Sequence, residues 1–129
     1  MAEMSIKKRP KNLDLTTIRL PLPGKLSILH RISGVGIFLM LPLLLWMFQA
    51  SVTSPDTFAA FQAALGHPLV KLILAGLTWA YLHHFCAGIR FLLLDMHVGV
   101  DLASARQSAG IVFAVSLTLT VILWGVLLW

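Results

Sequence analysis

The stretch ISGVGIFLMLPLLLWMFQA, residues 32–50, contains no Asp, Glu, Lys or Arg. At ~1.5 Å of rise per residue, a helix of this length covers most of the ~30 Å hydrocarbon core of a bilayer. Backbone polar groups in lipid need internal hydrogen bonds, which a helix supplies. We therefore predict a membrane-spanning helix over 32–50, with a bend at Pro42, because proline lacks the amide hydrogen that a helix interior requires.

Two further apolar runs of spanning length follow, at about 69–94 and 109–129. Short polar connections separate the three runs, so each helix returns across the membrane in the opposite direction to the one before it. The predicted fold class is therefore all-α and integral to the membrane, with three transmembrane helices running up, down and up. We treat 1–129 as a single membrane-anchor domain.

The connection SVTSPDTFAAFQAALGHP, residues 51–68, contains Asp56 but no Lys or Arg. Its spacing predicts a short interfacial helix over 57–65, with Ser54 as the cap and Pro55 in the first helical turn. This connection is expected to lie on the outer side of the membrane.

The composition excludes several classes of function. Hydrophobic residues make up 58% of the chain and charged residues only 12%, and the mean hydropathy is +0.88, far from a soluble domain. Nucleic acid is not an expected partner, since the basic residues flank apolar runs instead of lining an aromatic-rich groove. The single cysteine, Cys86, excludes an internal disulfide and a cysteine-ligated iron–sulfur cluster.

The distribution of charge predicts the orientation. Seven of the ten Lys and Arg residues lie in the basic segment 1–31, and Arg106 lies in the polar connection before the third span. The positive-inside rule therefore makes the N-terminus cytoplasmic and the C-terminus periplasmic. Lys71 is the one dissenting charge, and its long side chain can snorkel to the outer interface. The apolar run starts too late for a cleavable signal peptide.

Two neighbouring histidines, His83 and His84, fall inside the second span, where ionisable groups are rare. His84 is ~15 Å from the cytoplasmic end of its helix, near the middle of the hydrocarbon. Either a cross-helix hydrogen bond or a metal, most naturally haem iron, would satisfy such a ring. The two rings lie ~100° apart on the helix, so they cannot both serve one ligand.

Gly88 lies four residues after His84 on the same helical face and leaves space where a flat macrocycle could rest. The other histidines lie in loops or near the membrane surface, away from haem depth. A six-coordinate haem would therefore need its second axial ligand from another polypeptide. Glycines within the spans also favour close packing with helices of another subunit.

The motif SILHR (residues 27–31) ends the basic segment. In a helix, Ser27 and Arg31 would project from the same face at the membrane boundary, with His30 offset by one position. Ordinary interfacial anchoring explains such a pattern. The functional alternative is a polar pocket for a quinone, whose carbonyl oxygens accept hydrogen bonds while its tail prefers lipid. His30 and Arg31 are also candidate partners of haem propionates.

These motifs together resemble the cytochrome b556 membrane-anchor subunits of bacterial succinate dehydrogenases, the larger of the two anchors in respiratory complex II. The resemblance covers essentially the whole chain. It rests on these residues: Arg9 and Pro10, Asn12 to Leu15, Thr17 to Arg19, SILHR with Ser33 and Gly34, and His84, Gly88, Ile89, Arg90 and Asp95.

The resemblance implies that His84, not His83, is an axial ligand of a haem b shared with a second, smaller anchor subunit. It also implies that Ser27 and Arg31 help form the ubiquinone site, and that His30 and Arg31 lie near the haem propionates. No residue of this chain is expected to act on succinate. That reaction belongs to a flavoprotein subunit, which passes electrons through an iron–sulfur subunit docked at the bacterial cytoplasmic membrane.

One departure from the family pattern is Phe91, where the family often has a histidine, so a propionate contact by that side chain is not expected. Arg90 and Asp95 are family-motif residues without assigned chemistry, and we expect a structural Arg–Asp role for them near the cytoplasmic boundary. An anchor of a quinol:fumarate reductase remains an alternative within the same class. A noncatalytic scaffold, or a transporter component with a His83–His84 proton relay, is the alternative from another class.

Overall fold

The computed structural model describes residues 17–128, which fold into four helices without a β-strand. The helices are α1 (Leu22–Thr53), α2 (Pro55–Gly66), α3 (Pro68–Asp95) and α4 (Leu102–Leu128). Three of them, α1, α3 and α4, are long and apolar enough to cross a membrane. The all-α prediction with three spanning helices is confirmed.

Some sequence features fall outside the described residues. They are the basic side chains Lys7, Lys8, Arg9 and Lys11, the motif residues 9–15, and Trp129 at the end of the third predicted span.

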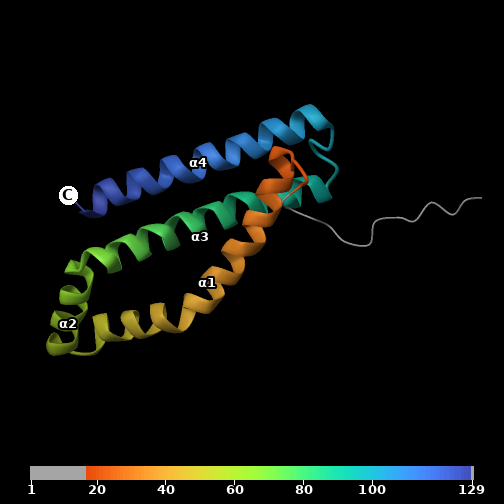
Figure 1. Ribbon diagram of the computed structural model, residues 1–129. Coiled ribbons are helices and arrows are strands. Elements are labelled where there is room, and N and C mark those ends of the chain that lie inside the picture. Colours follow the sequence, from red (N-terminus) through yellow and green to blue (C-terminus); the bar gives the residue numbers. More distant parts are fainter. Residues whose placement is uncertain (1–16, 129) are drawn as a thin grey trace, which may run out of the picture.

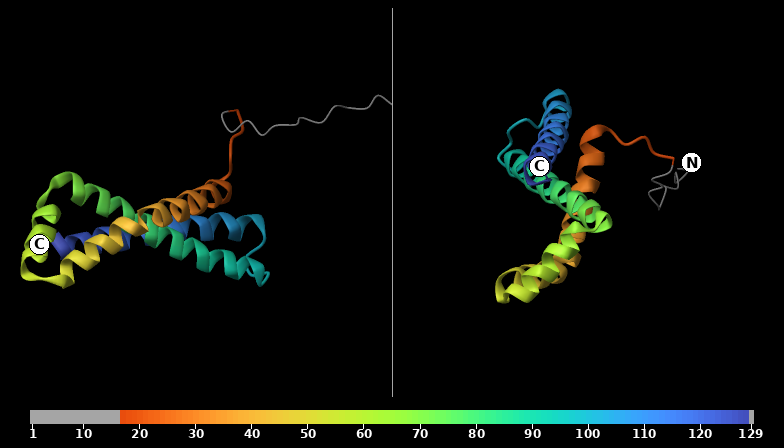
Figure 2. Two further views of the ribbon diagram at one scale, coloured as in Figure 1. Left: turned by 90° about the horizontal axis from the view of Figure 1, so that it is seen from below. Right: turned by 90° about the vertical axis from the view of Figure 1, so that its left-hand side faces the viewer.

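The three long helices lie close together at one end of the molecule, and α1 is separated from α4 at the other end (Figure 1). The start of α1 lies beside the connection between α3 and α4, whereas α2 joins the far ends of α1 and α3 (Figure 1). From its start α1 crosses α3 and then leaves it, while α4 stays beside α3 (Figures 1 and 2). Figure 1 also shows α1 bending in its second half, the half that contains Pro42, as proline in a helix interior predicts.

Helix α1 begins at Leu22, ten residues before the predicted span, so the SILHR motif forms part of its first turns. Pro23 fits the first turn of the helix, because the backbone amides of that turn have no partner within the helix. The apolar side chain of Leu26 is fully buried in a small core with residues of α3 and α4: Ala87, Ala109 and Val112. This contact explains why the helix extends into the basic segment.

The connection between α1 and α2 follows the sequence prediction. Ser54 caps α2, since its side chain accepts from the Thr57 amide while the Thr57 side chain accepts from the Ser54 amide, and Pro55 lies in the first turn. At the other end of the molecule, Asp101 caps α4 by accepting from the Ser104 amide at 2.9 Å. That hydrogen bond holds the pKa of Asp101 below its ordinary value.

Most of the apolar surface of the long helices is not covered by this chain. In the apolar 18-residue stretch of each helix, only 6% of the residues of α1 are buried, and only 11% of those of α3 and α4. Large apolar side chains such as Phe38, Trp46 and Val126 are exposed. Lipid or other subunits must therefore cover these helices, as expected for one part of a larger bundle.

Helix α3 ends in a Schellman motif, in which the Val98 amide donates to the Leu93 carbonyl and the His97 amide donates to the Leu94 carbonyl. His97 has a φ of 62°, in the left-handed region where glycine is usual at this position. A side chain in that conformation costs free energy that glycine avoids.

We expect His97→Gly to raise the free energy of unfolding by about 1 kcal/mol, because glycine adopts the left-handed conformation without strain. His97→Val should lower it, since a β-branched residue fits this region worst. Thermal unfolding of the purified protein in detergent measures both effects. Equal stability of the Gly and Val variants would contradict the role given to this turn.

Candidate functional site

The site is built where α1 crosses α3. His84 of α3 places its Nδ1 atom 3.0 Å from the backbone carbonyl oxygen of His30 and 3.3 Å from the hydroxyl of Ser33. Because a carbonyl oxygen can only accept, Nδ1 must carry the ring hydrogen and donate it. Ser33 also donates to the His30 carbonyl, at 2.9 Å. The His84 ring is therefore held in one tautomer and one orientation.

The other ring nitrogen of His84, Nε2, has no hydrogen-bond partner among residues 17–128. The described residues do not bury this atom completely. With Nδ1 protonated, Nε2 carries a free lone pair. A neutral imidazole whose other N–H donates to a backbone carbonyl is the arrangement that metal-ligating histidines usually show. This atom can therefore serve as a ligand to a metal presented from outside the chain.

Gly34 makes the close approach of His84 to α1 possible. A Cβ atom built on Gly34 would lie 2.8 Å from Cε1 of His84 and 3.2 Å from Nδ1, closer than side chains normally pack. The imidazole thus rests against the backbone of α1, and only glycine leaves room for it.

The side chain of His30 stacks on His84, with ring centroids 4.1 Å apart and an interplanar angle of 9°. It lies beside Gly88, where a built Cβ would be 3.8 Å from Nε2 of His30, and it packs against Phe91 at 5.0 Å. The ring of His30 therefore occupies the space that the sequence predicted beside His84 and Gly88. The expectation that His30 lies away from the depth of His84 is wrong, because the crossing of α1 and α3 stacks the two rings. Phe91 contributes packing to this cluster.

Ser27 and Arg31 lie in the first turns of α1, four residues apart, and so project from the same face as predicted. Arg31 is exposed and Ser27 is half-buried. No hydrogen bond of either side chain is found within residues 17–128, so their donors are free for a ligand.

His83 faces a different helix from His84. Its ring is 0% exposed and packs between Phe113 of α4 and Trp79 of its own helix. The ring centroids are 5.1 Å from Phe113 and 5.3 Å from Trp79. Neither of its ring nitrogens has a hydrogen-bond partner in the described part of the chain. The two histidines therefore point to different faces of α3, in agreement with their ~100° separation.

Arg90 has a structural role, as expected, but its hydrogen bonds do not go to Asp95. Arg90 donates instead to α4, from Nε to the Ser108 hydroxyl at 2.9 Å and from Nη2 to the Ala105 carbonyl at 3.1 Å. Its side chain therefore joins α3 to α4. The sequence did not reveal this partner because the contact depends on the register between two helices.

The other histidines have local roles. His67 caps α3 by accepting from the Leu69 amide at 3.2 Å, and His97 closes the far end of that helix. Within residues 17–128 no group of three or more His, Cys, Asp or Glu side chains could hold a metal ion.

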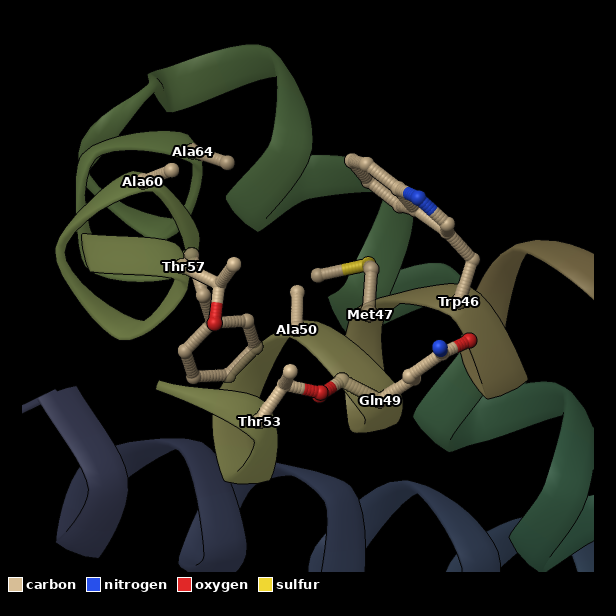
Figure 3. A pocket seen from close by; sticks show the side chains of 9 residues that line it. Trp46, Met47, Gln49, Ala50, Thr53, Thr57, Ala60 and Ala64 are labelled. Atoms are coloured by element: carbon tan, nitrogen blue, oxygen red, sulfur yellow. The ribbon is translucent and has the colours of Figure 1, made fainter. Parts of the chain in front are cut away.

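A separate pocket of about 280 Å³ lies between the end of α1 and α2, at the opposite end of the molecule from the α3–α4 connection. Figure 3 shows Trp46 and Met47 facing Thr57 and Ala60 across it. No ionisable side chain lines this pocket, so it offers no ligand to a metal and is distinct from the site around His84.

For two residues of the site, Ser33 and Gly34, the sequence predicts a place in a motif or in helix packing but not their contact with His84. Their spacing from His30 signals that the three share the first half of one helix. Which side chain of α3 meets them could be learned only from the structure.

Comparison with known proteins identifies the family of this chain. A family model described as the succinate dehydrogenase/fumarate reductase transmembrane subunit matches residues 5–123. A succinate dehydrogenase cytochrome b556 subunit of Coxiella burnetii is 38% identical over 123 residues, covering 95% of this chain and 98% of that protein. The protein of the same name from Paracoccus denitrificans is 34% identical over 122 residues, covering 95% and 94% of the two chains. The chain therefore belongs to the family of transmembrane subunits of succinate dehydrogenase and fumarate reductase.

Proposed function

We propose that this chain is a membrane anchor of a succinate:ubiquinone oxidoreductase that holds a haem b through His84 and contributes to the ubiquinone site. The observation that carries the proposal is the hydrogen bond from Nδ1 of His84 to the His30 carbonyl, which leaves Nε2 free as a ligand. The relatives named as cytochrome b556 subunits support a haem of the b type.

The residues around His84 fit such a group. Gly34 lets the ring lie against α1, and the His30 carbonyl and Ser33 hold its orientation. A haem bound at Nε2 would accept and release single electrons. In this proposal a smaller second anchor subunit supplies the other ligand of the haem.

Ser27 and Arg31 are the proposed donors to the carbonyl oxygens of ubiquinone. Their position at the start of α1 suits a ligand with a polar head and a lipid-soluble tail, and their donors have no partner within the described residues. A hydroxyl and a guanidinium can orient a quinone and hold its developing charge, but they do not themselves carry electrons. His30 and Arg31 are also the proposed partners of haem propionates, to which Phe91 cannot donate.

The proposed complex divides its work among subunits. A flavoprotein oxidises succinate, an iron–sulfur subunit docks at the cytoplasmic side, and this chain supplies no catalytic residue for the dicarboxylate. The shared end of the helices carries Arg19, Lys25, Arg31 and Arg106. Under the positive-inside rule this end faces the cytoplasm of a bacterium, with the C-terminus in the periplasm of its inner membrane.

A second candidate is the anchor of a quinol:fumarate reductase, which the family description also covers. It would use the same residues with quinol as the electron donor. The type of quinone bound and the redox potentials of the complex distinguish the two directions. A scaffold or a transporter component would bind no haem.

The first test is a haem assay with a reduced-minus-oxidised spectrum on the complex purified through a tag on this chain. We expect a b-type signal, about one haem per chain, with flavoprotein and iron–sulfur partners. His84→Ala should abolish most of that signal because it removes the ligand. His83→Phe is the matched control, since His83 packs between aromatic rings away from α1, and it should keep the haem. Normal haem in His84→Ala would defeat the assignment.

Gly34→Ala should also lower the haem content, because its methyl group would displace the His84 ring from α1. Overpacking of this kind typically costs about 1–3 kcal/mol. Gly36→Ala is the control on the same helix, where a built Cβ meets nothing within 4 Å. Spectra of the two purified variants should differ, with Gly36→Ala resembling the unmodified protein. Equal haem in both would remove the role given to Gly34.

Ser27→Ala and Arg31→Leu should each slow quinone reduction by about tenfold or more, because each removes a hydrogen-bond donor to the quinone. Succinate oxidation with an artificial electron acceptor should be retained. Lys25→Leu, which changes another exposed cation in the first turns of α1, should leave the quinone kinetics unchanged. Steady-state assays with a soluble quinone measure all three, and unaltered rates in the first two variants would rule out this quinone site.

A further inference from the structure

Arg90 is a buried charge without a counter-charge. Its side chain is only 5% exposed, and its two hydrogen bonds go to neutral acceptors, the Ser108 hydroxyl and the Ala105 carbonyl. No carboxylate within residues 17–128 forms an ion pair with it. A desolvated guanidinium of this kind is costly unless an anion lies nearby.

The position of Arg90 along α3 indicates which anions can reach it. The helix ends at Asp95, five residues later, so Arg90 lies ~7.5 Å along the axis from that end. Its guanidinium contacts Ala105 and Ser108 in the first two turns of α4, on the side of the boundary between lipid headgroups and hydrocarbon. Phosphate groups of phospholipids are the most abundant anions at that boundary.

A pocket of about 310 Å³ opens beside Arg90, between the end of α3 and the start of α4. Its lining combines hydrogen-bond donors with apolar walls. The donors include Arg90, Ser104, Gln107 and Ser108, and the apolar residues include Leu93 and Ile111. Such a lining suits a ligand with a polar head and an acyl chain.

We propose that this pocket binds the phosphate of an anionic phospholipid, with Arg90 as the counter-charge and Gln107 as a further donor. The site is separate from the proposed haem and quinone residues, because Arg90 faces α4 whereas His84 faces α1. A carboxylate also lies near the pocket: Asp101 accepts a hydrogen bond from the backbone amide of Ser104, one of the residues that line the pocket. The lipid would complete the contact between α3 and α4 at the cytoplasmic leaflet.

The test is native mass spectrometry of the full chain with the subunits that co-purify with it, titrated in detergent with phosphatidylglycerol. Arg90→Gln removes the buried charge, and Gln107→Glu places a carboxylate at an exposed position of the pocket without touching the core. Arg106→Gln is the matched control, since Arg106 is exposed and outside the pocket. Gln107→Glu and Arg106→Gln both lower the formal net charge from +5 by one.

We expect phosphatidylglycerol to bind about tenfold or more weakly to Arg90→Gln and Gln107→Glu than to the unmodified protein and Arg106→Gln. Phosphatidylcholine should compete poorly. Equal binding by all four proteins would overturn the proposal, as would displacement of the lipid by inorganic phosphate alone at similar concentration. If Arg90→Gln does not assemble, Gln107→Glu decides. Loss of a subunit with lipid binding unchanged would show a protein carboxylate in the pocket and would also overturn it.

Discussion

The hydrogen bond between His84 and the His30 carbonyl is the contact on which the arrangement of α1 and α3 depends. It joins the middle of one spanning helix to the first turns of another, and the ring can make it only because Gly34 has no side chain. In a bilayer, apolar burial contributes little to helix association, so close packing and polar contacts decide where helices cross. The same bond orients the imidazole, whose other nitrogen has no hydrogen-bond partner among residues 17–128.

Helix α3 separates two kinds of polar residue on two faces. Toward α1 it presents His84, and toward α4 it presents His83 and Arg90, both buried. The face toward α1 carries a nitrogen suited to a metal, whereas the face toward α4 carries a charge held by neutral acceptors. In the two proposals, α3 would hold a haem on one side and a lipid phosphate on the other.

The chain is built to be completed by other molecules. Its three spanning helices bury little of their apolar surface within the chain, and α1 leaves α3 after crossing it. His84 and His30 stack at the crossing, and no group of three or more His, Cys, Asp or Glu side chains within the described residues could hold a metal ion. A bundle shared with a second anchor subunit would cover the apolar faces and supply the missing ligand.

The sequence by itself determined the fold class, the number of helices long enough to span, the short capped helix after Ser54 and the family, because hydropathy and capping are local properties. It also separated His83 from His84, since helical periodicity places neighbours on different faces. Only the tertiary structure decided that His84 meets the His30 carbonyl and Gly34, and that Arg90 joins α4 rather than Asp95. Those contacts depend on the crossing point and register of helices, which no local pattern encodes.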